Sequence, residues 1–165
     1  MAYDERALRG VGGWLAFFIL TLTVFGPLRA IAQTWGNLYG DASVAAAYAD
    51  RWVLLQAVEW LLVAFAVGTS MFIGWRLYAV HVWRSVQLAI AGLWLIAPIV
   101  LLVDSIAVSL IAGMSLSALL GLTAGELART AAYGAIWTAY LLRSRRVANT
   151  YDRHPDADEL AGVFD

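Results

Sequence analysis

The sequence predicts an all-α integral membrane protein, a four-helix bundle of antiparallel hairpins with both termini in the cytoplasm. Three observations support this prediction. Apolar runs of about 20 residues recur along the chain, which is the length that a helix needs to cross the hydrocarbon core of a bilayer. The apolar fraction is 62%, against roughly 45–50% in soluble proteins. Arginines lie before the first run, between the second and third runs, and after the fourth run, and a four-helix topology places all these positions on one side of the membrane,.

Four membrane-spanning helices are expected, at about 11–32, 52–78, 86–111 and 117–142. The first run follows Arg6 and Arg9 as in a signal peptide. It exceeds the apolar region of about 7–15 residues that such peptides carry, so we interpret it as a retained helix. In the loop that follows, Asp41 or Ser43 is suited to capping a short surface helix,. The next two loops are only a few residues long, which favours antiparallel hairpins.

Arginine placement predicts the orientation of these helices. The arginines that mark one side of the membrane are Arg6, Arg9, Arg76, Arg84, Arg143, Arg145 and Arg146. By the positive-inside rule this side is the cytoplasm. We expect the last three to form a basic cluster that anchors anionic lipid. Residues 1–146 are then the transmembrane domain, and residues 147–165 form a polar cytoplasmic tail.

Five charged side chains interrupt the predicted spans: Arg29, Glu59, Asp104, Glu126 and Arg129. A charge inside a span costs several kcal/mol unless it is paired. With a helical rise of about 1.5 Å per residue, all five fall in the outer half of the membrane, so we expect them to meet as a buried cluster. Two arginines face three carboxylates, which favours uptake of a proton or a cation. The cluster is either a structural network, a site for a ligand, lipid headgroup or ion, or a proton relay.

Small residues recur on one face of the predicted fourth span at spacings of four and three: Gly121, Gly125, Ala128, Ala132, Ala135 and Ala139. Such a stripe lets two helices approach closely. A second stripe runs beside it through Glu126, Arg129, Tyr133, Ile136 and Tyr140. The first stripe predicts helix packing within the protein, and the alternative is a seam between two copies of the chain.

Several kinds of chemistry lack support in the sequence. The chain has no cysteine, and His81 and His154 stand alone, so we expect no metal site and no cofactor,. A net charge of −1 argues against a nucleic-acid partner,. Phosphate-binding loops and nucleophile–histidine motifs are absent. An intramembrane aspartyl enzyme that uses Asp104 and Glu59 has no accompanying motif, so a non-enzymatic protein is expected.

Short motifs resemble a known family. Gly12-Gly13-Trp14-Leu15 opens the first span and Gly26-Pro27-Leu28 follows within it, while the chain leaves the fourth span through Ser144-Arg145-Arg146-Val147-Ala148-Asn149-Thr150. Together these segments resemble the bacterial domain-of-unknown-function family 2569, over nearly the whole chain. The resemblance implies a small bacterial inner-membrane protein with four helices, and it brings no activity with it.

Small size and short loops lead us to expect an accessory subunit or assembly factor of a larger membrane complex. Its partners would be membrane lipids and either another membrane protein or a second copy of itself. The alternative is a small carrier, or a lipid- or ligand-binding protein, that works as a homodimer through the same charged cluster.

Overall fold

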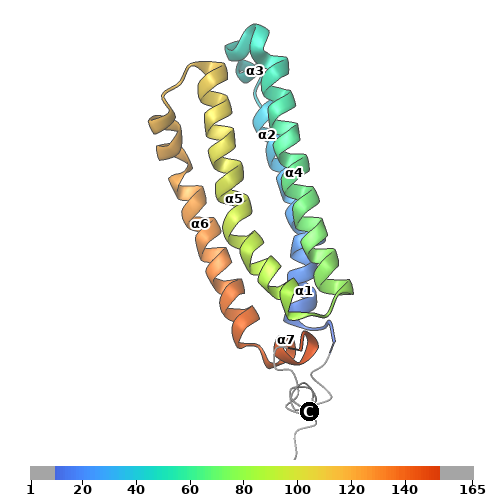
Figure 1. Ribbon diagram of the computed structural model, residues 1–165. Helices are drawn as coiled ribbons and strands as arrows, with labels where there is room; N and C mark the ends of the chain where they lie inside the picture. Colours follow the sequence, from blue (N-terminus) through green and yellow to red (C-terminus); the bar gives the residue numbers. More distant parts are fainter. Residues whose placement is uncertain (1–9, 153–165) are drawn as a thin grey trace, which may run out of the picture.

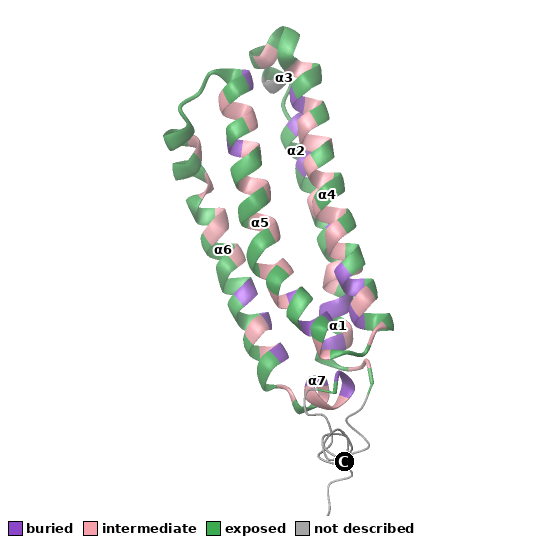
Figure 2. Ribbon diagram, viewed as in Figure 1, coloured by how far each residue is buried: buried purple, intermediate pink, exposed green. Residues whose placement is uncertain are grey.

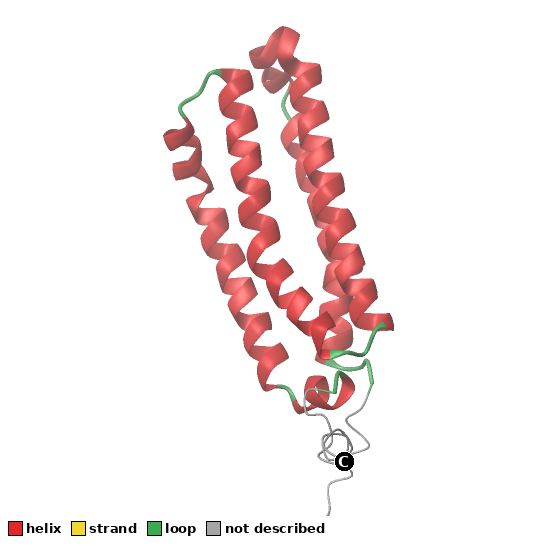
Figure 3. Cartoon of the chain, in the orientation of Figure 1, coloured by secondary structure: helices red, strands yellow, loops and turns green. Residues whose placement is uncertain are grey.

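The computed structural model describes residues 10–152, and all regular secondary structure among them is helical (Figure 3). The predicted all-α class is therefore confirmed. The long helices run side by side along one axis: α6 lies beside α5, α5 beside α4, and α2 lies behind α4 in the view of Figure 1.

The first long helix consists of α1 (Trp14–Leu20), a π-helical turn η2 (Thr21–Phe25) and α2 (Gly26–Tyr39). It extends seven residues beyond its expected end at residue 32. Pro27 does not break it because this proline follows the π-helical turn, where the Gly26 N–H donates to the Thr21 carbonyl and the hydrogen-bond ladder is locally adjusted,. Beyond residue 32, Thr34 and Leu38 are buried one turn apart, and packing of Leu38 against Leu55 and Ile111 favours continued helix.

A short helix, α3 (Ala42–Tyr48), and a 3₁₀ turn, η3 (Ala49–Arg51), connect the first long helix to α4. Asp41 caps α3, because its carboxylate accepts a hydrogen bond of 2.8 Å from the backbone N–H of Ser43. The same contact with Ser43 lowers the pKa of Asp41. The predicted surface helix and the cap by Asp41 are confirmed.

The remaining long helices form antiparallel neighbours. Helices α4 (Trp52–Ala79) and α5 (Trp83–Ala112) are joined through residues 80–82, and α6 (Leu116–Arg143) follows after residues 113–115. Gly113 ends α5 with a φ of 70°, a left-handed conformation that suits glycine,. Both short loops agree with the expected hairpins.

Three helical segments are long and apolar enough to cross a membrane, namely Trp14–Tyr39, Ala45–Ala79 and Trp83–Ala112. Helix α6 is not among them, and it carries Glu126 and Arg129 near its middle. These three candidate spans indicate a membrane protein, and a fourth crossing by α6 stays a prediction.

Burial is concentrated at the end of the bundle where α1 and α7 lie (Figure 2). The main core there contains Leu15, Phe18, Leu77, Val86 and Leu141, all at most 1% exposed. Most of the remaining helical surface is exposed or half-buried, and its exposed apolar side chains suit contact with lipid,.

The two ends of the described chain meet at this core. Helix α7 (Arg145–Thr150) folds back beneath the bundle, and the Gly10 N–H donates to Thr150 Oγ1 at 3.0 Å. Tyr151 is fully buried, and its hydroxyl donates to the Leu77 carbonyl at 2.6 Å. Burial raises the pKa of Tyr151, so the hydroxyl keeps its proton and remains a donor. Of the predicted polar tail, the part from residue 153 onward lies outside the described residues.

Replacing Tyr151 with phenylalanine is expected to lower stability by about 1–2 kcal/mol, because the Leu77 carbonyl loses its donor in a buried place. Thermal unfolding in mild detergent, followed by circular dichroism, measures this change. Tyr78 is 63% exposed on the same helix as Leu77, so Tyr78→Phe is the matched control. Equal melting temperatures for the two variants would contradict the assigned hydrogen bond.

Candidate functional site

Three of the five charged residues form one ion-paired group between α2 and α6. Glu126 accepts from Arg29 Nη2 through Oε1 and from Arg129 Nη1 through Oε2, both at 3.2 Å. A single carboxylate therefore bridges two guanidinium groups. The side chains of Arg29 and Arg129 are 70% and 80% exposed from the protein, whereas that of Glu126 is 31% exposed.

Helix periodicity explains why α6 presents this group on one face. Glu126, Arg129 and Tyr133 follow one another at spacings of three and four, so their side chains project from the same side of the helix,. The Tyr133 hydroxyl lies 3.0 Å from Thr21 Oγ1 of η2. Two polar contacts, Arg29–Glu126 and Thr21–Tyr133, thus connect α6 to the first long helix.

The other two charged residues form a separate carboxyl pair. Glu59 of α4 and Asp104 of α5 lie close enough for their carboxyl groups to affect each other, and both line a cavity that Glu126 also lines. Asp104 Oδ1 is buried and has no hydrogen-bond partner among the described residues. The structure therefore brings all five predicted residues to adjoining cavities and divides them into a basic and an acidic group.

Three adjoining cavities lie between α2, α4, α5 and α6. The one that contains Arg29, Glu126 and Arg129 has a volume of about 480 Å³, and the one beside Glu59 and Asp104 has about 310 Å³. They share the lining residues Ala30, Gln33, Glu126 and Thr130.

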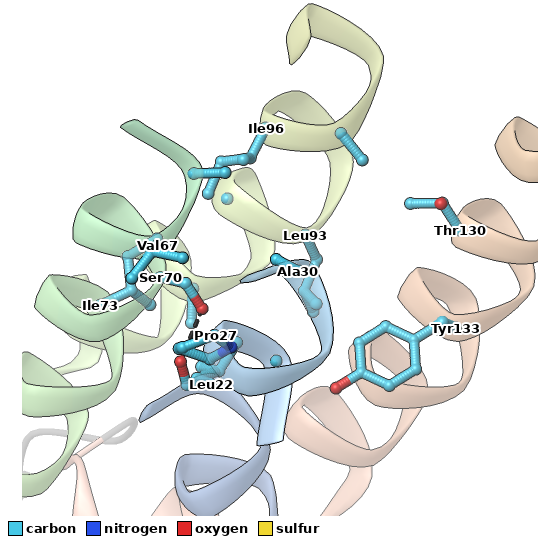
Figure 4. A pocket seen from close by; sticks show the side chains of 15 residues that line it. Leu22, Pro27, Ala30, Val67, Ser70, Ile73, Leu93, Ile96, Thr130 and Tyr133 are labelled. Atoms are coloured by element: carbon cyan, nitrogen blue, oxygen red, sulfur yellow. Dashed lines mark hydrogen bonds between the residues drawn. The ribbon is translucent and has the colours of Figure 1, made fainter. Parts of the chain in front are cut away.

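The third cavity, of about 230 Å³, is almost wholly apolar. In Figure 4, Pro27 and Ala30 of α2 face Thr130 and Tyr133 of α6 across it, with Ile96 of α5 above them. The Ser70 hydroxyl is satisfied by the Leu22 carbonyl at 2.7 Å. This cavity offers space for a hydrocarbon chain and little for a polar group.

Sequence reasoning missed some polar residues of the site. Thr21, Gln33 and Thr130 line the cavities but were not predicted. Thr21 lies in an apolar stretch, Gln33 adjoins Thr34, and Thr130 adjoins Arg129, so the available signal was a polar residue inside a predicted span or at its end.

The other predicted sites lie elsewhere. The small-residue stripe of α6 faces outward, with every member exposed: Gly121, Gly125, Ala128, Ala132, Ala135 and Ala139. No helix of residues 10–152 covers the stripe, so the predicted role of the stripe in helix packing stays a prediction. Arg143 at the end of α6 and Arg145 at the start of α7 are exposed, whereas Arg146 is half-buried beside Gly12. Within residues 10–152, no group of three or more His, Cys, Asp or Glu side chains is placed to hold a metal.

The model of the family described as protein of unknown function (DUF2569) matches residues 8–151 of the chain. The chain belongs to this family. The DUF2569 match begins just before Gly10 and ends at Tyr151, so it encloses the contact that joins the two ends of the described chain. No curated protein and no solved structure matches the chain. Membership therefore supplies no activity, and function has to be argued from the site.

Proposed function

We propose that this chain is a non-enzymatic accessory subunit or assembly factor of a larger complex in the bacterial inner membrane. The observation that carries this proposal is the outward small-residue stripe of α6. A Cβ added at Gly121 or Gly125 would meet nothing within 4 Å. A helix surface that faces only lipid gains from bulky aliphatic side chains, whereas glycine and alanine favour a closely packed partner helix.

The proposal includes four membrane crossings with both termini in the cytoplasm. Helix α6 has 28 residues and lies alongside α5, which suits a fourth crossing. Its charged residues Glu126 and Arg129 lower its hydropathy, but their pairing with Arg29 reduces the cost of placing them in the membrane,. The contact between Gly10 and Thr150 puts both ends of the described chain at one end of the bundle, and the arginine distribution assigns that end to the cytoplasm,.

Native mass spectrometry on the protein, extracted from its own membrane in mild detergent, tests the accessory role. A second polypeptide at a fixed ratio is the expected result. A chain recovered only as a lone monomer would overturn the proposal.

Substituting leucine for Gly125 is expected to abolish association with the partner and leave the isolated fold intact. The added side chain meets open space in the chain itself but would separate α6 from a helix packed on the stripe,. Gly68→Leu is the matched control, since Gly68 is an exposed glycine of α4 that also has nothing within 4 Å. If Gly125→Leu still associates with the partner in the same native spectra, the stripe is excluded as the contact surface.

A second candidate is a small carrier that works as a homodimer. The same outward stripe favours it, because four helices enclose too little space for a pathway and a second copy could complete one. Two copies of the chain with no other polypeptide in the native spectrum would support this candidate over the accessory role. Loss of the dimer in Gly125→Leu, but not in Gly68→Leu, would place the seam at the stripe.

A further inference from the structure

The ion-paired group between α2 and α6 has unused capacity to bind an anion. A guanidinium carries five N–H donors, and the bonds to Glu126 use one from Arg29 and one from Arg129,. One carboxylate also leaves one positive charge of the pair uncompensated. Both side chains are largely exposed and line the 480 Å³ cavity, so remaining N–H groups are accessible there. Phosphate oxygens match guanidinium groups in charge and geometry.

The neighbouring carboxyl pair has the opposite requirement. Glu59 and Asp104 line the same cavity from neighbouring helices, and the structure gives neither an ion pair with a cation in the part of the chain that it describes. Asp104 Oδ1 is buried and lacks a donor among those residues. Two interacting carboxyl groups are stabilised by a shared proton or by a cationic donor. A primary ammonium supplies both positive charge and N–H donors.

The two polar regions and the apolar cavity are connected. Glu126 and Gln33 line both polar cavities, whereas Leu22, Gly26 and Tyr133 line both the basic cavity and the apolar one. An occupant would therefore need an anionic group, a cationic group close to it and a hydrocarbon chain. A helix of a partner protein could supply an acidic side chain, but it would not place an anionic group, a cationic group and a hydrocarbon chain together in these cavities.

We propose that these cavities bind one phospholipid of the surrounding membrane whose headgroup carries a primary ammonium, with its phosphate at Arg29 and Arg129 and its ammonium at Glu59 and Asp104. The first part of an acyl chain then lies along Leu22, Pro27 and Ile96 (Figure 4). Arg29 lies about 22 Å along the helix axis from Trp14, from the helical rise. The hydrocarbon core of a bilayer is about 30 Å thick, so Arg29 lies inside it, short of its outer boundary. The headgroup of the bound lipid would therefore lie deeper than the headgroups of the surrounding bilayer.

The experiment is native mass spectrometry of delipidated protein in detergent, titrated with three dioleoyl lipids: phosphatidylethanolamine, phosphatidylglycerol and phosphatidylcholine. Phosphatidylethanolamine is expected to bind about tenfold more tightly than the other two, which corresponds to about one charge-assisted hydrogen bond. Phosphatidylcholine has the same charges but no N–H on its ammonium, so it tests hydrogen bonding to the carboxyl pair. Phosphatidylglycerol lacks the ammonium altogether.

Variants assign the two halves of the headgroup. Arg129→Gln is expected to lower the affinity for all three lipids about tenfold. Asp104→Asn is expected to remove the preference for phosphatidylethanolamine and leave phosphatidylglycerol unchanged. Glu59→Gln serves the same purpose if Asp104→Asn fails to fold, as judged by circular dichroism. Arg84→Gln removes an exposed arginine at the other end of α5 and should change none of the affinities.

Equal affinity of the wild-type protein for the three lipids would overturn the proposal. The proposal would also be overturned if Arg129→Gln lowered the lipid affinity no more than Arg84→Gln does. Displacement of the lipid by millimolar inorganic phosphate would instead identify a free-phosphate site. A protein partner that is lost in Arg129→Gln, together with no retained lipid, would identify the cavities as a protein interface and would equally refute the lipid site.

Discussion

Replacing Gly74 by leucine is expected to destabilise this protein strongly, because α4 has no room for a side chain at this position. A Cβ at Gly74 would overlap Thr23 Cγ2 and would lie 3.3 Å from Leu22 Cβ and 3.6 Å from the Ile19 carbonyl oxygen. These atoms belong to α1 and η2, so the first long helix and α4 approach each other closely at this glycine. Overpacking typically costs about 1–3 kcal/mol and more where backbone must move, so we expect a loss of at least about 3 kcal/mol.

Expression in the membrane fraction and thermal unfolding in detergent both measure this effect. Gly68→Leu provides the control, since it makes the same change six residues earlier on α4 where nothing lies within 4 Å. Gly68→Leu should express and melt like the wild type. If the two variants are equally stable, the close approach of α4 to the first long helix is incorrect.

The length of the apolar runs predicted the helices well, because an apolar run of about 20 residues seldom forms anything other than a membrane-spanning helix. The expected spans at 52–78, 86–111 and 117–142 each fall within one or a few residues of α4, α5 and α6. The cap by Asp41 was also predictable, because it depends on two neighbouring residues and local geometry,. The extension of the first helix to Tyr39 was missed because Leu38 packs against Leu55 of α4 and Ile111 of α5, and a local pattern does not show such distant contacts.

The pairing of charges between different helices could not be predicted, although their common layer could. Counting residues along a helix gives depth, but it does not give the rotation of one helix against another. The sequence therefore placed Arg29, Glu59, Asp104, Glu126 and Arg129 at similar depths without separating the bridge at Glu126 from the Glu59–Asp104 pair. Periodicity has the same limit on α6, where it identified a small-residue face but not its outward direction.

The role of Tyr151 was hidden for a different reason. It lies between a basic cluster and an acidic segment, so composition indicates a solvated tail. Its ring is nevertheless fully buried against the core, and its hydroxyl reaches Leu77, which is 74 positions away in the chain. One aromatic residue among charges gives little local signal of burial.

Glu126→Gln is the second change with a large expected effect, because it removes the carboxylate that holds both arginines. An arginine at the centre of a span costs about 2.5–3.5 kcal/mol on insertion scales, and movement toward the interface recovers part of this. We therefore expect Glu126→Gln to lower stability by about 2–4 kcal/mol. Thermal unfolding in lipid nanodiscs measures the loss, and Glu126→Asp, which keeps the charge, should retain most of the stability.

A double substitution separates charge from shape. If the bridge stabilises by compensating charge, adding Arg29→Gln to Glu126→Gln removes one uncompensated cation and should recover part of the lost stability. No recovery would mean that Glu126 acts by packing alone. The same variant also bears on the lipid site, because a bound phosphate supplies the negative charge that Glu126 provides in the wild type. Adding phosphatidylethanolamine should therefore raise the melting temperature of Glu126→Gln more than that of the Arg29→Gln/Glu126→Gln protein, which offers the phosphate only Arg129.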